Sequence, residues 1–267
     1  MAIVDLAALH DLAVSIAAAT ATEVVRRSNE SFEVATKSSA TDLVTEIDAW
    51  AERFIIDSIS EARPDDGFIG EEGADSASRS GVTWVIDPID GTTNFVYRYP
   101  MFAVSIAAVT ETETLVGAVA HCSSGEVYHA TTGGGAFVGE SPLAVSDQQS
   151  LPQSLVATGF GYDAEQRRQQ AQQLTHIIGE VRDIRRSGSA ATDLAFTAAG
   201  LVDAYYEAGL NRWDIAAGEL IVREAGGLVD LTETGNRRYS VLAAAPGVFD
   251  ELRVLLKMAR GHADGPW

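Results

Sequence analysis

The sequence is poor in cysteine and in basic residues. A single cysteine, Cys122, excludes an internal disulfide and gives no support for a thiolate metal site. Lysine and arginine number 19 against 38 acidic residues, so the formal net charge is −19 at pH 7. A general nucleic-acid surface needs a basic patch, so we expect no direct nucleic-acid binding. Such a chain also repels phosphate esters at long range, so an anionic substrate would need local positive charge, for example bound metal ions.

The chain also lacks a basic N-terminal segment and a long apolar run. Asp5 lies near the start without a preceding basic region, which argues against a signal peptide. The longest apolar stretch covers about residues 12–21 and is interrupted by Ser15 and Thr20. It is shorter than the roughly 20 apolar residues that cross a bilayer. We therefore expect a cytoplasmic protein without a membrane partner.

The length and the hydrophobic content of 46% suit one large domain or two fused lobes with a substantial core. We expect an N-terminal α+β lobe over about residues 1–145 and a C-terminal α/β lobe over about 152–262, joined by the polar segment 142–152. The final residues, 262–267, are expected to be disordered.

Hydrophobic periodicity predicts the elements of the two lobes. Expected helices cover residues 3–27, 43–62, 164–179, 213–225 and 249–259, and one more opens at 187–191 and runs to about 199. Expected strands cover residues 32–37, 67–70, 84–86, 102–109, 115–120, 126–130, 136–138, 155–157, 183–185, 202–207 and 241–245. The strands between 102 and 138 are separated by short turns, which favours an antiparallel meander.

The most informative stretch runs from Trp84 to Phe95. Residues 84–86 read as a buried strand, Pro88 is expected to stop its pairing, and Gly91 permits a tight turn. A helix opening at Thr92 would then place its free backbone N–H groups beside two carboxylates. Because carboxylates bind hard cations and helix N-termini bind phosphate, the stretch suggests a metal-assisted phosphate site.

The residues alone leave other readings of this stretch open. Asp, Pro and Gly are turn formers, so a plain surface turn is as well supported as a site. A calcium loop of the EF-hand type needs ligands at alternate positions, which Pro88 does not suit. A phosphatase with an Asp-x-Asp-Gly-Thr nucleophile is a closer rival, but Asp87 and Asp90 are three positions apart.

Other acidic residues have both a plain and a functional reading. Thr45 and Asp48 share one face near a helix N-terminus, where solvated acids are common. Glu71 and Glu72 follow a short strand and read, on their own, as a solvated acidic loop. Asp214 in the first turn of its helix would favour the helix dipole without any site.

The stretch from 84 to 95 resembles the first signature of the inositol monophosphatase family, magnesium-dependent phosphomonoesterases. The second signature is matched by residues 213–218, Trp-Asp-Ile-Ala-Ala-Gly, followed by Glu-Ala-Gly-Gly at 224–227. Smaller matches lie at 42–48 and 70–72. They follow the family's order over about residues 40–230, which is most of the chain. The resemblance implies a layered αβαβα sandwich and a homodimer.

The resemblance also implies a site for two or three Mg²⁺ ions. The first ion would be held by Glu71, Asp87 and the Ile89 carbonyl, and the second by Asp90 and Asp214 with Asp87 bridging. A third would use Glu71 and, through water, Asp48. The implied catalytic residues are Thr92, Asp48 and Glu71, with Thr92 orienting a metal-activated water that attacks phosphorus without a covalent enzyme intermediate.

The implied substrate is inositol 1-phosphate, cleaved to myo-inositol and phosphate. Its phosphate oxygens would lie on the N–H groups of Gly91 and Thr92. Its hydroxyl groups would meet a second set of residues: Asp90, Gly188, Ser189, Ala190, Glu207 and Asp214. Carboxylates accept hydrogen bonds from vicinal hydroxyls, which suits a polyol. The family also suggests lithium sensitivity.

Two alternative functions remain at this point. One is a related phosphatase acting on fructose 1,6-bisphosphate, histidinol phosphate or a 3′-phosphonucleotide, because a few pocket residues decide the substrate. The other is a regulatory protein, since some bacterial relatives bind the transcription machinery.

Overall fold

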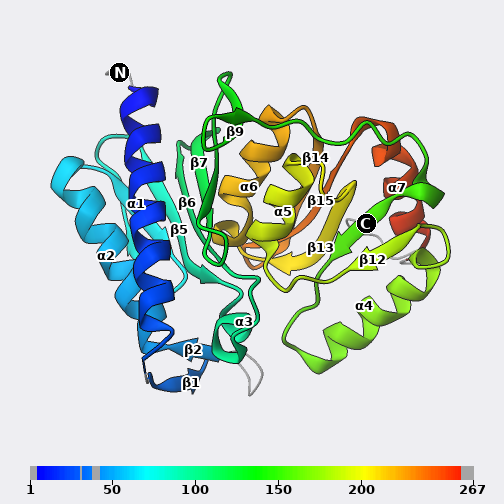
Figure 1. Cartoon of the computed structure of the whole chain (residues 1–267), viewed down its shortest axis with the longest axis horizontal. Coiled ribbons are helices and arrows are strands. Elements are labelled where there is room, and N and C mark those ends of the chain that lie inside the picture. Colours follow the sequence, from blue (N-terminus) through cyan, green and yellow to red (C-terminus); the bar gives the residue numbers. More distant parts are fainter. Residues whose placement is uncertain (1–4, 31, 38–42, 260–267) are drawn as a thin grey trace.

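The chain folds as an αβαβα sandwich, the fold class expected from the sequence (Figure 1). The computed structural model describes residues 5–30, 32–37 and 43–259. The expected start of the first helix at residue 3, Asp42 of the 42–48 match and the tail 262–267 lie outside these residues. Two large β-sheets alternate with three helical layers, and three hydrophobic clusters fill the spaces between them.

The first helical layer consists of α1 (Leu6–Arg27) and α2 (Glu46–Ala62). In α1, the carboxylate of the N-cap residue Asp5 accepts a hydrogen bond from the Ala8 N–H at 3.1 Å, and two arginines lie in the last turn. A small two-stranded sheet, β1 (Val34–Thr36) and β2 (Leu43–Thr45), lies beside this layer.

Helix α1 is long enough to cross a membrane, since it has 22 residues and a mean hydropathy of 1.3. The expectation that its apolar stretch is too short for a span is therefore wrong on length, because Ser15 and Thr20 stay inside the helix. Its packing explains its composition instead. Leu9, Ala17 and Val24 are fully buried in the cluster that α1 shares with the first sheet.

The first sheet has eight strands in the order β10-β9-β8-β7-β6-β5-β3-β4. From β5 to β10 it is an antiparallel meander, as expected, while β3 pairs with β5 in parallel. Its strands are β3 (Gly67–Gly70), β4 (Asp75–Ser76), β5 (Thr83–Asp90), β6 (Ala103–Val109), β7 (Thr114–His121), β8 (Glu126–Thr131), β9 (Gly135–Val138) and β10 (Ser141–Pro142). The short helix α3 (Thr92–Tyr97) follows β5.

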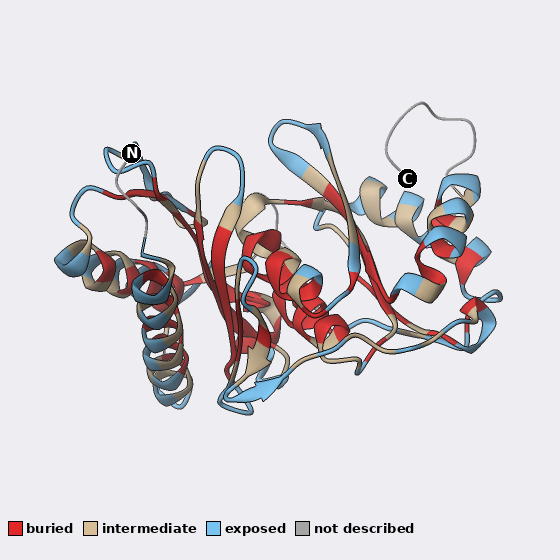
Figure 2. Ribbon diagram, turned by 90° about the horizontal axis from the view of Figure 1, so that it is seen from above, coloured by how far each residue is buried: buried red, intermediate tan, exposed pale blue. Residues whose placement is uncertain are grey.

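The second sheet has five strands in the order β12-β11-β13-β15-β14, with bounds β11 (Leu155–Thr158), β12 (Asp183–Arg185), β13 (Ala204–Leu210), β14 (Leu228–Gly235) and β15 (Arg238–Ala244). Helices α5 (Ala190–Ala198) and α6 (Arg212–Glu224) lie between the sheets, where Figure 2 shows mostly buried residues. A 3₁₀ turn (Leu151–Gln153) precedes this sheet, and α4 (Ala164–Ile177) and α7 (Pro246–Ala259) cover its outer face.

Three local expectations were wrong. Residues 43–45 form strand β2 rather than the start of a helix, because the Thr45 side chain caps α2 from outside. Strand β14 was missed, since it is a polar edge strand without clear alternation. Pro88 does not end β5, which continues to Asp90 through a bulge that needs no N–H from the proline.

A buried carboxylate ties α2 to the first sheet. The Asp66 side chain, 1% exposed, pairs with the Arg63 guanidinium. It also accepts hydrogen bonds from the Trp84 indole N–H at 2.9 Å and the Ser80 hydroxyl at 2.5 Å. The Trp84 ring is fully buried, so its indole N–H depends on this acceptor, whereas Arg63 is half-buried and Ser80 is exposed.

We expect Asp66→Ala to lower the free energy of unfolding by about 3 kcal/mol, because the half-buried Arg63 guanidinium and the buried Trp84 indole N–H lose their acceptor together. Urea unfolding measures the effect. The control is Asp65→Ala, whose ion pair with Arg79 is largely exposed and should contribute less than about 1 kcal/mol. Equal losses in the two variants would contradict this account of Asp66.

Candidate active site

The site is built around the end of β5. Between Asp87 and Asp90, two residues of β5 lie opposite one residue of β6, since Asp87 pairs with Ser105 and Asp90 with Ala103. In a regular strand, residues three apart point to opposite faces. The bulge supplies the extra residue that brings both carboxylates to one side. The Asp87 carboxylate also accepts the Ile89 N–H at 3.1 Å, which fixes the bend.

Gly91 connects β5 to α3 in a conformation that favours glycine. Its φ is +92°, and a Cβ there would lie 3.0 Å from the Met101 carbonyl oxygen and 3.2 Å from that of Gly188. The tight turn places Thr92 in the first turn of α3, directly beyond Asp90. The expected sequence of strand, turn and helix is thus confirmed.

Glu71 reaches the same place from the neighbouring strand. β3 and β5 are parallel, and Gly70 pairs with Ile86. The residues that follow, Glu71 and Asp87, therefore lie next to each other, and the Glu71 N–H donates to the Ile86 carbonyl at 3.2 Å. The reading of Glu71 as a solvated loop residue is wrong, because its side chain is 21% exposed and forms an ion pair with Lys37 at 2.8 Å.

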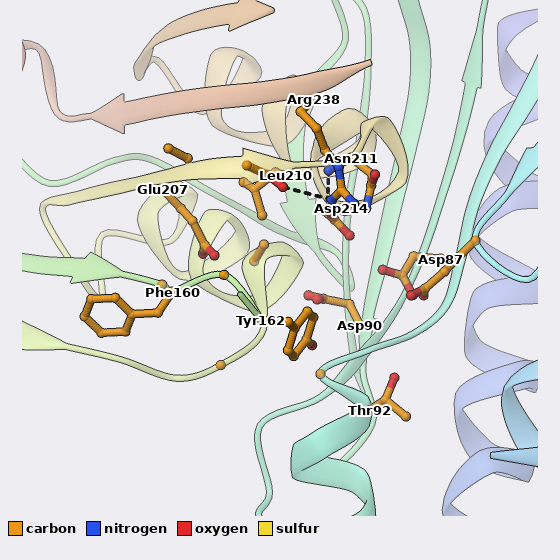
Figure 3. Close-up of a pocket in the computed structure, with 18 of the residues that line it drawn as sticks. Asp87, Asp90, Thr92, Phe160, Tyr162, Glu207, Leu210, Asn211, Asp214 and Arg238 are labelled. Atoms are coloured by element: carbon orange, nitrogen blue, oxygen red, sulfur yellow. Dashed lines mark hydrogen bonds between the residues drawn. The ribbon is translucent and has the colours of Figure 1, made fainter. Parts of the chain in front are cut away.

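Asp214 comes from the opposite side, on the first turn of α6. One of its oxygens, Oδ2, accepts the Asn211 N–H at 2.6 Å and completes a capping box. A carboxylate oxygen from each of Asp87, Asp90 and Asp214 can be chosen so that all three lie within 4.8 Å of one another. Figure 3 shows the three side chains converging above Thr92.

Burial and mutual repulsion disfavour the charged forms of these acids. The pKa values of Asp87 and Asp214 are raised well above the ordinary value, first by burial and then by neighbouring carboxylates. The pKa of Asp90 rises to about 6 because it is buried, although hydrogen bonds from Ser189 and Ala191 oppose the shift. Burial also raises the pKa of Glu71, against the opposing charge of Lys37.

This donor set fits a hard divalent cation such as Mg²⁺. The converging atoms are all oxygens, which is the ligand type that Mg²⁺ prefers. Among the described residues, no lysine or arginine forms an ion pair with Asp87, Asp90 or Asp214. A bound cation would therefore offset the repulsion among these carboxylates, which the nearby charge of Arg186 and the hydrogen bonds to Asp90 oppose only in part.

Asp48 lies behind Thr92 rather than in the cavity. It is fully buried, and its Oδ2 accepts the Thr45 N–H at 2.8 Å and the Thr45 hydroxyl at 2.5 Å. Its Oδ1 lies 3.2 Å from the Thr92 hydroxyl, which is also 3.1 Å from the Ile89 carbonyl oxygen. The solvated reading of Asp48 is thus wrong, and burial raises the pKa of its carboxyl to about 6.

The second half of the chain lines the other side of the cavity. Asp90 Oδ2 accepts the Ser189 hydroxyl at 2.5 Å and the Ala191 N–H at 2.6 Å, which links β5 to the start of α5. Glu207 on β13 points into the cavity, and its Oε2 accepts the Tyr205 hydroxyl at 2.7 Å. Burial raises the pKa of Glu207 to about 7.

The cavity has a volume of about 310 Å³ and gathers nearly all of the residues selected from the sequence. Ten of them line it: Glu71, Asp87, Ile89, Asp90, Gly91, Thr92, Gly188, Ala190, Glu207 and Asp214. Asp48 and Ser189 are not among the lining residues. They contact it through Thr92 and Asp90.

Several contributors were not found from the sequence. The loop 159–163, which follows β11 and includes Tyr162, lines the cavity, and Arg186 and Arg238 lie beside it. The pair Gly159 and Gly161 after a parallel strand was an available signal, because ligands bind at the carboxyl ends of such strands. Lys37 had no such signal, since it lies 34 positions before its partner Glu71.

Comparison with known proteins gives a consistent result. A family model described as the inositol monophosphatase family matches residues 5–258. Inositol-1-monophosphatase SuhB of Mycobacterium tuberculosis is 46% identical over 239 residues, covering 85% of this chain and 82% of that protein. Nus factor SuhB of Escherichia coli is 43% identical over 223 residues, covering 80% of this chain and 82% of that protein.

Solved structures agree with the sequence comparison. The structure of Mycobacterium tuberculosis SuhB superposes with a TM-score of 0.84 at 41% identity, covering 97% of this chain and 99% of that one. Staphylococcus aureus inositol monophosphatase II, described as bound to inositol monophosphate, gives 0.76 at 28% identity, with 92% of each chain covered. The bulged β5 signature, the α6 signature and these matches together show that the chain belongs to the inositol monophosphatase family.

Proposed function

We propose that this chain hydrolyses the phosphate monoester of a small polyol, with inositol 1-phosphate as its substrate. The observation that carries the proposal is the convergence of three carboxylates, within 4.8 Å, in the cavity that Glu207 and the Gly91 turn also line. One end of the cavity therefore suits cations and phosphate, and the other suits hydroxyl groups. A phosphorylated polyol combines both features in one small molecule.

The residues that would hold Mg²⁺ are Glu71, Asp87, Asp90, Asp214 and the carbonyl group of Ile89. When bound, the ions supply positive charge that stabilises the phosphoryl group and the leaving oxygen and makes water more acidic. The backbone N–H groups of Gly91 and Thr92 would hold the phosphate oxygens. Because the chain carries a net charge of −19, this local arrangement must provide the attraction for an anion.

Thr92 and Asp48 form a proton pathway beside the phosphate position. The Thr92 hydroxyl has Asp48 Oδ1 at 3.2 Å as one acceptor, so it can donate to Asp48 while accepting a hydrogen bond from the attacking water. Asp48 keeps its other oxygen on Thr45, which fixes its orientation. Its pKa of about 6 suits a group that takes up a proton near neutral pH.

The polyol end of the cavity is formed by acceptor groups. Glu207 uses Oε2 for the Tyr205 hydroxyl, and its other oxygen is placed to accept hydrogen bonds from a substrate hydroxyl pair. Asp90 similarly keeps one oxygen for Ser189 and Ala191. Acceptors of this kind favour inositol over an ester without vicinal hydroxyls, because they would be left unpaired by the latter.

A regulatory function is the second candidate, and one observation favours it. Relatives named Nus factor SuhB are 42–44% identical to this chain, close to the 46% of the mycobacterial phosphatase. The percentage of identical residues therefore does not tell which of the two functions this chain has. They can coexist, since the residues that line the cavity come from other elements than the outer helices α1, α2 and α7, whose exposed faces a protein partner could contact.

Phosphate release from inositol 1-phosphate should require Mg²⁺ and should fall by ~10³-fold in kcat/KM in Asp90→Asn, since the variant loses a charge that binds the cation. Release is measured with and without EDTA, beside fructose 1,6-bisphosphate, histidinol phosphate and a 3′-phosphonucleotide. Faster turnover of another ester would keep the reaction and replace the substrate. No release from any ester would overturn the phosphatase and leave the regulatory function.

Thr92→Val should lower kcat by roughly 10²-fold or more with little change in KM, because it removes the hydroxyl from the proton pathway and keeps the side-chain shape. Thr92→Ser is the matched control and should retain most activity. Equal losses in both variants would show that the methyl packing of Thr92, rather than its hydroxyl, matters for turnover.

Mg²⁺ should stabilise the protein more at pH 8 than at pH 5. In the folded, metal-free protein the pKa values of Asp48 and Asp90 are raised to about 6 and that of Glu207 to about 7. Groups with raised pKa values contribute most to stability below their unfolded values near 4, and this contribution is lost as the pH rises through 6 to 7.

Thermal melts should therefore show a Mg²⁺-induced rise in Tm of roughly 5–10 °C at pH 8, with Mg²⁺ at about 100 times its Kd, and a smaller rise at pH 5. The reference sample contains EDTA, and KCl keeps the ionic strength equal. A rise of the same size at both pH values would contradict the linkage between cation binding and these carboxylates.

A further inference from the structure

The turn between β3 and β4 determines where Glu71 lies. Gly70 donates its N–H to the Ala74 carbonyl oxygen at 2.8 Å, which closes the turn. Glu71 is its first residue, and its own N–H is held by Ile86 of β5. A change in the path of this short turn would move the Glu71 carboxylate away from Asp87.

A second carboxylate, from helix α2, accepts hydrogen bonds from the backbone of this turn. Glu52 on α2 is 5% exposed, and its Oε2 accepts the Glu72 N–H at 2.8 Å. Its Oε1 accepts the Ala74 N–H at 3.1 Å. Each oxygen of one buried side chain thus binds one N–H of the turn that carries Glu71.

Gly70 leaves the space that this arrangement needs. A Cβ on Gly70 would lie 2.2 Å from Glu52 Oε2 and 2.7 Å from the carboxyl carbon. Any other residue at position 70 would push the Glu52 carboxylate out of the turn. The contact therefore involves two residues from different elements, α2 and β3, and either one can be changed to test it.

We propose that Glu52 is a positioning residue, which holds the turn 71–74 so that Glu71 faces Asp87 and thereby sets the affinity of the site for a divalent cation. Glu52 does not line the cavity, so it acts through Glu71. The inference rests on the proposed function, because it assumes that a cation binds at Glu71. Groups that support metal ligands in this way typically change metal affinity by about 10–100-fold when mutated.

The most informative variant is Glu52→Gln. Glutamine has nearly the same shape, but its amide has one acceptor oxygen and one donor NH₂ group. The NH₂ group would face a backbone N–H of the turn, so one hydrogen bond is replaced by a contact between two donors. Gly70→Ala should disturb the same contact from the other side. Glu61→Gln, at an exposed position of α2, is the matched control.

The test titrates each folded variant with Mg²⁺ in a calorimeter and also measures phosphate release from inositol 1-phosphate against Mg²⁺ concentration. We expect Glu52→Gln and Gly70→Ala to bind Mg²⁺ about 10-fold or more weakly than wild type. At saturating Mg²⁺, kcat should recover, and KM for inositol 1-phosphate should remain at the wild-type value. Glu61→Gln should match wild type throughout.

Each outcome decides between the possibilities. Unchanged Mg²⁺ binding in Glu52→Gln would overturn the positioning role, and so would a loss of kcat that saturating Mg²⁺ does not restore. If Glu52→Gln does not fold, as judged by circular dichroism, Gly70→Ala carries the same test. If the wild-type protein hydrolyses the ester but binds no Mg²⁺, the positioning role is overturned and the phosphatase function stands. If the wild-type protein neither hydrolyses the ester nor binds Mg²⁺, both the positioning role and the proposed function are overturned.

Discussion

The repulsion between buried carboxylates is the constraint on which this site depends. Asp87, Asp90 and Asp214 offer oxygens within 4.8 Å of one another, and burial adds the cost of removing their charges from water. The fold keeps the carboxylates close together despite this repulsion, because Asp87 and Asp90 lie on a bulged strand and Asp214 lies on the first turn of a helix that is packed between the two large sheets. A flexible loop carrying the same charges would move them apart, so the central helix layer is what makes a cation site possible.

The carboxylates share one structural solution. In each case one oxygen is used by the fold and the other is left for the site. Asp48 and Asp214 both occupy the third position of a capping box, with Oδ2 bound to the backbone N–H of the N-cap residue. Asp90 commits Oδ2 to the start of α5, and Glu207 commits Oε2 to Tyr205. The hydrogen bonds that orient these side chains also stabilise the helices and strands that carry them, so orientation requires few additional residues.

The sequence predicted most of the fold because its signals were local. The meander between β6 and β9 and the helices of the second half follow from periodicity and turn residues, and the signatures identified every carboxylate of the proposed metal site. The failures have physical reasons. Solvated and buried acids look alike in a sequence, so Glu71 and Asp48 were ambiguous until their elements were packed together. Glu52 and Lys37 gave no signal, since their roles arise from contacts over 20 and 34 residues.

The two ends of the cavity differ in how well they tolerate amino-acid substitutions. The end that we propose for the metal depends on backbone features, namely the bulge in β5, the φ of +92° at Gly91 and the capping box of α6. A substitution there alters the fold as well as the chemistry. The end that we propose for the polyol is lined by single side chains of β13, the loop 159–163 and the start of α5. Those side chains can be replaced without changing the path of the chain, and each can alter substrate preference by about 1–3 kcal/mol. With the proposed function, we therefore expect members of this fold to carry out one reaction on several substrates, with the substrate preference set at Glu207 and its neighbours rather than at the carboxylate cluster.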